Sequence, residues 1–214
     1  MKRRRLPLIS LITDRRRYGP GRLLTTIAAA ARAGVDIIQI RERDLDDRAL
    51  LALVGAAVAA AAGSSAVVVN DRLDIALAAG AGGVHLRGDS VSAMNARHLA
   101  PAGFLIGRSV HSRAEAMRVS AEGGVDYLVF GTVFPSASKS AGHPAAGADE
   151  LARVCASVTT PVLAVGGVGQ AEAATVARAG AAGVAGIGLF ADCTDLQGLI
   201  AEIRKMFDSS AGVV

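Results

Sequence analysis

Aromatic residues are scarce in this chain of 214 residues: Phe, Tyr and Trp make up 3%, and Trp is absent. Surfaces that bind single-stranded nucleic acid need aromatic side chains as stacking platforms among their basic residues. Much of the net charge of +4 lies instead in two short basic clusters, at residues 2–5 and 15–17. We therefore expect no nucleic-acid partner, and we interpret residues 1–7 as a basic, solvated tail.

Cysteines and long apolar runs are also few. The two cysteines, Cys155 and Cys193, lack the spacing of metal ligands and favour reduced thiols in a cytoplasmic protein. The apolar stretch near the N-terminus is short and contains Pro7, Ser10 and Asp14. This interruption argues against both a signal peptide and a membrane span, so we expect a cytoplasmic protein with no membrane partner.

A pattern of small residues and glycine, followed by an apolar run, recurs four times. It occurs at residues 33–40 (AGVDIIQI), 80–86 (GAGGVHL), 122–130 (EGGVDYLVF) and 179–187 (AGAAGVAGI). Glycine after a helical pattern is typical of a helix C-terminus, and the short apolar run is typical of a buried parallel strand. Four more strands are predicted between these, at residues 8–12, 66–70, 104–107 and 161–165.

Helical patterns separate the predicted strands, for example from Asp46, from Ser112 and from Asp195. Ser112 with Glu115 has the spacing of a capping box. Eight strand–helix units predict an α/β fold, a single-domain (β/α)8 TIM barrel over residues 8–208, followed by a tail at 209–214. The alternative is a doubly wound open sheet, but no G-x-G-x-x-G motif follows the first strand.

Polar residues follow the predicted strands, where the active site of a barrel lies. In QIRERD, strand alternation would direct Gln39, Arg41 and Arg43 toward the barrel mouth. The third strand ends at Asn70 and Asp71, and the Asp71 carboxylate could bind a divalent cation. His85, within the fourth strand, is equally consistent with a core residue and with a site residue.

Two glycine-rich loops predict a phosphate pocket. Gly166, Gly167 and Gly188 lie after the seventh and eighth strands, where barrels often bind phosphate through backbone amides. The simpler alternative is two tight turns. The loop after the sixth strand carries Ser136, Ser138 and Lys139, which could hold a second phosphate, while its glycine-rich remainder could fold as a flap. We therefore expect two phosphate groups at opposite sides of one mouth.

Several motifs occur in the order found in a known family: QIRERD, NDRLDIALAAGAGGVHL, GRSVHS, DYLVFGTVFPSASK, PVLAVGGV and AGAAGVAGI. Over roughly residues 8–190 the chain resembles the thiamine phosphate synthases and the related TenI-type thiazole tautomerases. The resemblance implies a (β/α)8 barrel that acts on small phosphorylated heterocycles. In the synthase branch, hydroxymethylpyrimidine diphosphate is joined to thiazole phosphate with release of pyrophosphate, and Mg²⁺ is the cofactor.

The resemblance also implies roles for individual residues. Gln39 and Arg41 match positions on the pyrophosphate side, and Arg43 stands where lysine is usual. Asp71 matches a Mg²⁺ ligand, and Ser109 matches a serine of the site. The other matched positions are Asn70, Ser136, Ser138 and Lys139, together with Gly166, Gly167 and the residues around Gly188 in the thiazole-phosphate pocket.

Two departures from the family separate its activities. The synthase branch usually reads Gly-Gln-Glu-Asp after strand four, whereas this chain reads RGDS, so Ser90 replaces a Mg²⁺-binding Asp. The second carboxylate is therefore shifted or lost, and Asp89, one residue earlier, is the candidate for the second Mg²⁺ ligand beside Asp71. The acid–base His of the tautomerase branch is Thr132 here, and His143 or His111 would have to replace it. The synthase is favoured, and the alternatives are a TenI-type thiazole phosphate tautomerase and a non-catalytic regulator that binds thiazole phosphate or thiamine phosphate. The oligomeric state, including a homo-oligomer, is left open.

Overall fold

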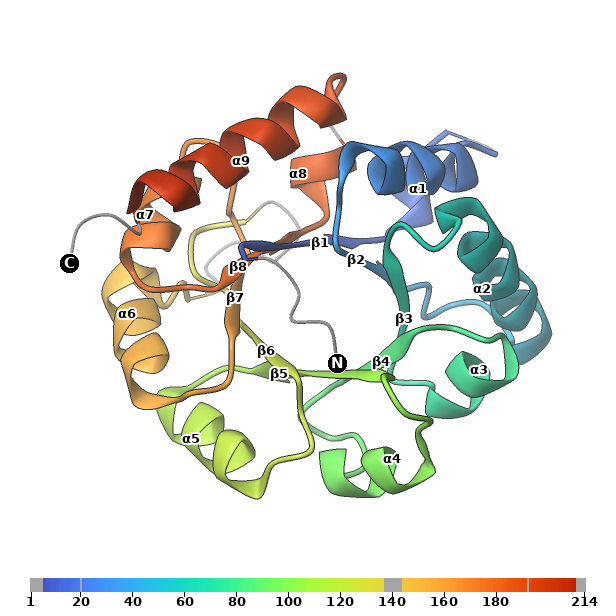
Figure 1. Ribbon diagram of the computed structural model, residues 1–214, viewed down its shortest axis with the longest axis horizontal. Helices are drawn as coiled ribbons and strands as arrows, with labels where there is room; N and C mark the ends of the chain where they lie inside the picture. The colour runs from blue at the N-terminus through green and yellow to red at the C-terminus, as the bar shows by residue number, and fades with distance from the viewer. Residues whose placement is uncertain (1–5, 20, 137–143, 192, 211–214) are drawn as a thin grey trace.

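The computed structural model describes residues 6–19, 21–136, 144–191 and 193–210. Eight parallel strands form one closed barrel in the order of the sequence, and β1 pairs with both β2 and β8 (Figure 1). The strands are β1 (Leu8–Ile12), β2 (Ile37–Ile40), β3 (Ala66–Asn70), β4 (Gly83–Leu86), β5 (Leu105–Val110), β6 (Tyr127–Phe130), β7 (Val162–Val165) and β8 (Gly183–Gly186). Closure confirms the TIM barrel and excludes the open sheet.

The helices surround the barrel as an outer ring (Figure 1). They are α1 (Arg22–Ala33), α2 (Asp47–Ala61), α3 (Leu73–Ala78), α4 (Ala93–Leu99), α5 (Arg113–Glu122), α6 (Gly147–Ser157), α7 (Ala173–Arg178), α8 (Gly188–Ala191) and α9 (Leu196–Ser210), with a 3-10 turn, η1 (Arg15–Arg17). Among the described residues, no helix combines the length and apolar character needed to cross a membrane.

Helix starts follow the polar residues expected from the sequence, with one difference. Asp46 caps α2 by accepting a hydrogen bond from the Ala49 amide at 2.8 Å. Ser112 caps α5 in the same way through the Glu115 amide at 3.2 Å. The Glu115 carboxylate, however, bonds to the His111 amide at 2.8 Å and not to that of Ser112. Glu115 therefore accepts from the amide one residue before the one that a capping box predicts, because the backbone turns the His111 amide toward the Glu115 carboxylate.

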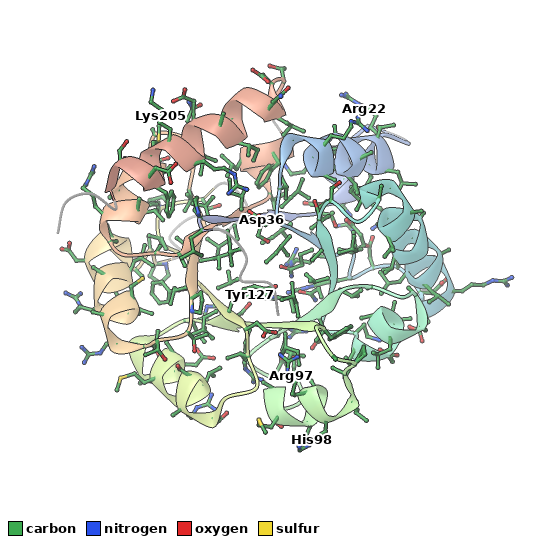
Figure 2. The ribbon with its side chains drawn as sticks, viewed as in Figure 1. Arg22, Asp36, Arg97, His98, Tyr127 and Lys205 are labelled. Atoms are coloured by element: carbon green, nitrogen blue, oxygen red, sulfur yellow. The ribbon has the colours of Figure 1, made fainter. Side chains whose placement is uncertain are left out.

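Two apolar cores result from strand alternation. One fills the barrel interior and contains Leu8, Ile12, Ile37, Val68, Leu105, Tyr127, Val129, Leu163 and Ala185. The other lies between the strands and the helices and is built mainly from Val, Leu, Ile and Ala. Tyr127 lies inside the ring of strands, whereas Arg22, His98 and Lys205 lie on the outside (Figure 2). The interior core closes the barrel below its C-terminal mouth.

Asp36 and Asp126, which come from two copies of the repeat, make the same kinds of contact at the N-terminal ends of the strands. Each carboxylate accepts a hydrogen bond from a strand amide, at 2.8 Å in β1 and 2.7 Å in β5. Each also pairs with an arginine, Arg204 at 3.0 Å for Asp36 and Arg97 at 2.6 Å for Asp126. Contacts at this end of a barrel serve stability, and the active site of a barrel lies at the opposite, C-terminal end of the strands.

Candidate active site

A cavity of about 770 Å³ opens at the C-terminal ends of the strands. Its volume lies within the range of small-molecule sites. The floor is formed by one inward-facing residue from each strand: Ile12, Gln39, Asn70, His85, Ser109, Val129, Val165 and Ala185. Every strand therefore contributes to the floor, as expected when alternate side chains of a closed barrel point inward.

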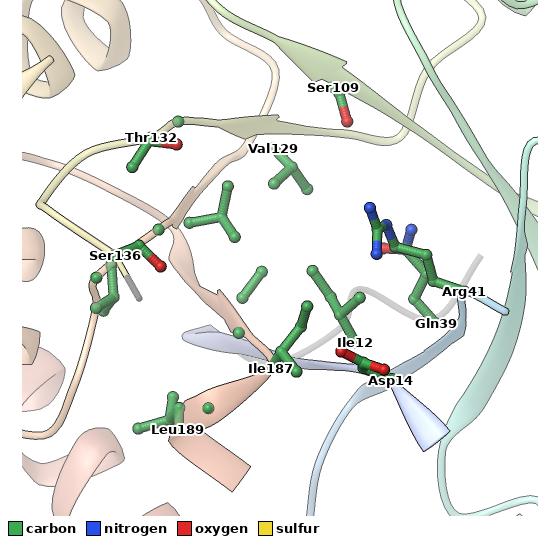
Figure 3. Close-up of a pocket in the computed structure, with 18 of the residues that line it drawn as sticks. Ile12, Asp14, Gln39, Arg41, Ser109, Val129, Thr132, Ser136, Ile187 and Leu189 are labelled. Carbon is green, nitrogen blue, oxygen red and sulfur yellow. The ribbon is translucent and has the colours of Figure 1, made fainter. Parts of the chain in front are cut away.

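The floor has two chemically different halves. Strands β2 to β5 contribute Gln39, Asn70, His85 and Ser109, whereas β6, β7, β8 and β1 contribute apolar side chains. Gln39 Nε2 donates to Asn70 Oδ1 at 3.1 Å, which links two neighbours of the polar half. In Figure 3, Gln39 and Ser109 lie apart from Ile187 and Leu189, across the cavity. One half can hydrogen-bond a polar ligand, and the other can cover an apolar ring face.

His85 connects the floor to the barrel interior. Its Nε2 lies 2.9 Å from Ser109 Oγ, and its Nδ1 lies 3.3 Å from the Tyr127 hydroxyl. Burial lowers the pKa of His85 to about 4. The imidazole is therefore neutral at pH 7, with one ring nitrogen donating and the other accepting. The Tyr127 ring needs Gly107 beside it, since a Cβ there would lie 2.2 Å from the ring.

The burial of His85 predicts a specific loss of stability in acid. The unfolded chain binds a proton near pH 6.5 that the folded protein binds only near pH 4, so the stability contributed by neutral His85 falls as pH drops between these values. The full effect is on the order of 3 kcal/mol in the free energy of unfolding. Urea unfolding at pH 7 and pH 4 should show a smaller pH-dependent loss for His85→Gln than for the wild type. Equal losses would contradict the assignment.

Cationic residues form the rim above the polar half. Although β2 ends at Ile40, both Arg41 and Arg43 line the cavity. Glu42, between them, is buried and accepts a hydrogen bond from the Arg15 amide at 3.0 Å. Thr13 Oγ1 accepts one from the Arg41 amide, also at 3.0 Å. These contacts fix the backbone so that the Arg41 side chain extends into the cavity (Figure 3).

Arg41 is the less solvated of these two cations. Its pKa lies below the usual arginine value, first because it is partly buried and second because Arg43 is close by. A bound anion would relieve both effects, since it would replace lost water and offset the repulsion between the two guanidinium groups. This part of the rim is therefore suited to a ligand with several negative oxygens.

The two predicted metal ligands lie on either side of a guanidinium. Arg87 Nη1 is 3.4 Å from Asp71 Oδ2, and Arg87 Nη2 is 2.7 Å from Asp89 Oδ2. Asp71 also accepts a hydrogen bond from the Ser90 hydroxyl. Arg87 and Asp89 line the cavity, whereas Asp71, although within the described part of the chain, does not. Both oxygens of Asp71 and one oxygen of Asp89, which a metal would use, are therefore engaged by side chains.

Glycines dominate the rim above the apolar half. Gly166, Gly167 and Gly188 line the cavity together with Ser136. Gly166 and Gly167 have φ of +91° and +63°, and the β6–α6 loop packs against them so closely that a Cβ on Gly167 would lie 2.3 Å from the Pro135 carbonyl oxygen. Tight packing between two loops, as well as access for a ligand, thus requires glycine here.

Most predicted site residues meet at this cavity. Gln39, Arg41, Arg43, Asn70, Asp89, Ser109, Ser136, Gly166, Gly167 and Gly188 all line it. Ser138, Lys139 and His143 lie outside the described residues, so their predicted roles stay predictions. Arg87 was not among the predicted site residues, although its position directly after β4 was a usable signal. His111 also lines the cavity, and its Nδ1 lies 2.8 Å from the Gly131 carbonyl oxygen.

Comparison with known proteins gives a consistent result. The family model described as "Thiamine monophosphate synthase" matches residues 9–190. The thiamine-phosphate synthase of Methanoculleus marisnigri is 41% identical over 171 residues, 79% of this chain and 80% of that protein. That of Anaeromyxobacter dehalogenans is 38% identical over 181 residues, 85% of this chain and 81% of that protein.

A solved structure agrees with these sequences. The thiamine phosphate pyrophosphorylase from Pyrococcus furiosus superposes with a TM-score of 0.81 at 29% identity, and the match covers 96% of this chain and 98% of that one. The matched family segment contains β1 from Ile9 onward, the other seven strands in full, and every residue of the cavity floor. Fold, site position and sequence together place this chain in the thiamine monophosphate synthase family.

Proposed function

We propose that this protein is a thiamine-phosphate synthase, which joins hydroxymethylpyrimidine diphosphate to thiazole phosphate and releases pyrophosphate. The observation that carries the proposal is the division of one cavity into an arginine-rich side and a glycine-rich side. Two phosphorylated heterocycles need such a division, because each anionic group must be held while the two rings meet between them. The names of the matched relatives support the same activity.

The diphosphate belongs on the arginine-rich side. Arg41 and Arg43 supply two fixed positive charges, and guanidinium groups bind phosphate oxygens with directed pairs of hydrogen bonds. The linked amides of Gln39 and Asn70 lie on the same side of the floor. They offer both donors and acceptors to the polar edge of a pyrimidine ring.

The thiazole phosphate belongs on the glycine-rich side. Backbone near Gly166, Gly167 and Gly188 lines the rim there, at the position where barrels commonly bind phosphate. Ser136 adds a hydroxyl to the same rim. The apolar floor residues Val129, Val165 and Ala185 can cover the face of the thiazole ring.

The reaction breaks one bond and forms another at a single carbon. The C–O bond between the pyrimidine methylene and the diphosphate breaks, and its electron pair leaves with the diphosphate. The thiazole nitrogen then forms the new C–N bond with its lone pair. Arg41 and Arg43 stabilise the charge that develops on the departing diphosphate, which is the interaction that lowers such a barrier.

Mg²⁺ is implied by the family, but the described residues do not fit it as they are arranged. Mg²⁺ needs free oxygen ligands, commonly one or two carboxylates together with substrate phosphates. Here the Asp71 and Asp89 carboxylates share Arg87, and Asp71 also accepts a hydrogen bond from Ser90. Among the described residues, no group of three or more His, Cys, Asp or Glu side chains could hold a metal ion.

One experiment separates the synthase from its alternatives. The protein is incubated with both substrates, with and without Mg²⁺, and thiamine phosphate and pyrophosphate are measured. The synthase should form both products in equal amounts. Exchange of thiazole-phosphate protons in the absence of the pyrimidine would indicate a tautomerase, and ligand-induced thermal stabilisation without turnover would indicate a regulatory binder. A cytoplasmic location is part of the same proposal, because the substrates are small phosphorylated metabolites.

A further inference from the structure

The loop between β4 and α4 holds a positive charge between two carboxylates from different loops. Asp71 follows β3 and Asp89 follows β4, and the Arg87 guanidinium reaches both, at 3.4 and 2.7 Å. Asp71 and Arg87 are only partly exposed, at 31% and 38% of their side chains, whereas Asp89 is exposed. The Asp71–Arg87 pair is therefore screened less than an ion pair on an open surface.

The surrounding contacts hold this arrangement in place. Ser90 Oγ accepts a hydrogen bond from the Arg87 amide at 2.7 Å and donates one to Asp71. The buried Arg108 guanidinium donates to two carbonyl oxygens of the same loop, at 2.9 and 3.1 Å. The loop is therefore fixed from both sides, and Arg87 lies where its charge faces the cavity as well as the carboxylates.

We propose that Arg87 is a built-in cation that occupies the place of a divalent metal between Asp71 and Asp89. A guanidinium and a hard divalent cation compete for the same carboxylate oxygens. As long as Arg87 keeps them, the substrate-free protein binds a divalent cation weakly. The proposal rests on the proposed function only where it relates Arg87 to the diphosphate side of the cavity. The competition for Asp71 and Asp89 itself involves no substrate.

The position of Arg87 also suits the anionic side of the cavity. After burial and the charge of Arg43, the charge of Arg87 is among the causes that lower the pKa of Arg41. Arg87 thus adds positive charge to the side assigned to the diphosphate, as a bound metal ion would. In the loop sequence RGDS, Ser90 stands at the position that the family resemblance gives to a carboxylate, and Arg87 supplies a positive charge in the same loop.

The test is calorimetric titration of Mn²⁺ into the protein without substrates. The wild type should show weak binding, and Arg87→Met should bind one Mn²⁺ at least tenfold more tightly, because two carboxylates lose their counter-ion. The double variant Arg87→Met with Asp71→Asn should lose this gain. Arg43→Met is the matched control, since it removes the same charge from the same cavity but leaves the Arg87 ion pairs intact.

Two results would overturn the proposal: equal Mn²⁺ affinity of the wild type and Arg87→Met, or an equal gain in Arg43→Met. If Arg87→Met does not fold by circular dichroism, Arg87→Gln and Arg87→Lys replace it. The glutamine variant should then bind Mn²⁺ more tightly than the wild type, and the lysine variant should not. The opposite result would also contradict the proposal. Because no substrate is present, failure of the synthase assay would leave this result unaffected.

Discussion

Arg41→Met is expected to reduce kcat/KM for the diphosphate substrate by about 10²- to 10³-fold, the usual loss when one preorganised charge-stabilising group is removed. Arg41 is the partly buried cation of the rim, and two backbone contacts position the segment around it. Methionine keeps the apolar stem of the side chain but is shorter, and it removes the charge and the hydrogen-bond donors. The measurement is steady-state kinetics of pyrophosphate release with each substrate varied in turn.

The control for this variant is Arg48→Met, which removes the same charge from an exposed position on α2 outside the cavity lining. It should change kcat/KM less than twofold. Arg41→Met should also leave the KM for thiazole phosphate within about threefold of the wild type, since that ligand is assigned to the glycine-rich side. A loss of similar size for both substrates would mean that Arg41 supports the whole cavity and does not act on the diphosphate.

Gly167→Ala is expected to weaken thiazole-phosphate binding by at least about tenfold and to lower the free energy of unfolding by about 2 to 4 kcal/mol. Two costs combine. An alanine must adopt φ near +63°, and its Cβ would lie 2.3 Å from the Pro135 carbonyl oxygen. Relief of that contact requires movement of the loop that carries Ser136, which is part of the same rim. Binding is measured by titration calorimetry and stability by urea unfolding.

Gly80→Ala isolates the first of these costs. Gly80 has φ of +66°, and a Cβ there would meet no atom within 4 Å. Its cost should therefore be only the strain of a left-handed alanine, about 1 kcal/mol, with unchanged ligand affinity. Should Gly167→Ala bind thiazole phosphate as the wild type does, the phosphate pocket would have to be placed elsewhere in the cavity.

Much of the site could be predicted from the sequence because strand alternation is a local property. Gln39, Asn70 and Ser109 each lie two residues beyond an inward-facing position of their strand, and a period of two directs them into the barrel. Arg41 and Arg43 continue that alternation past the end of β2. Their place at the rim follows from the parallel strands, whose C-terminal ends lie at the same end of the barrel.

Other features depended on contacts between distant segments. The sequence left His85 equally consistent with core and site, and the structure shows that it is both, since it lies buried between Tyr127 and Ser109 and also lines the cavity. Gly167 was predicted to make room for a ligand, but close packing of the β6–α6 loop also requires glycine at this position. Neither result is visible locally, because each depends on which side chain of a neighbouring strand or loop stands opposite.

The sequence by itself therefore determined the eight strand–helix units, the end of the barrel that carries the chemistry, and most residues that reach it. Only the tertiary structure decided how those residues pair. From the sequence, Asp71 and Asp89 were candidate metal ligands, and closure of the barrel set the Arg87 guanidinium between them. The physical reason is that alternation and helix capping act over a few residues, whereas ion pairing depends on distances that the whole barrel fixes.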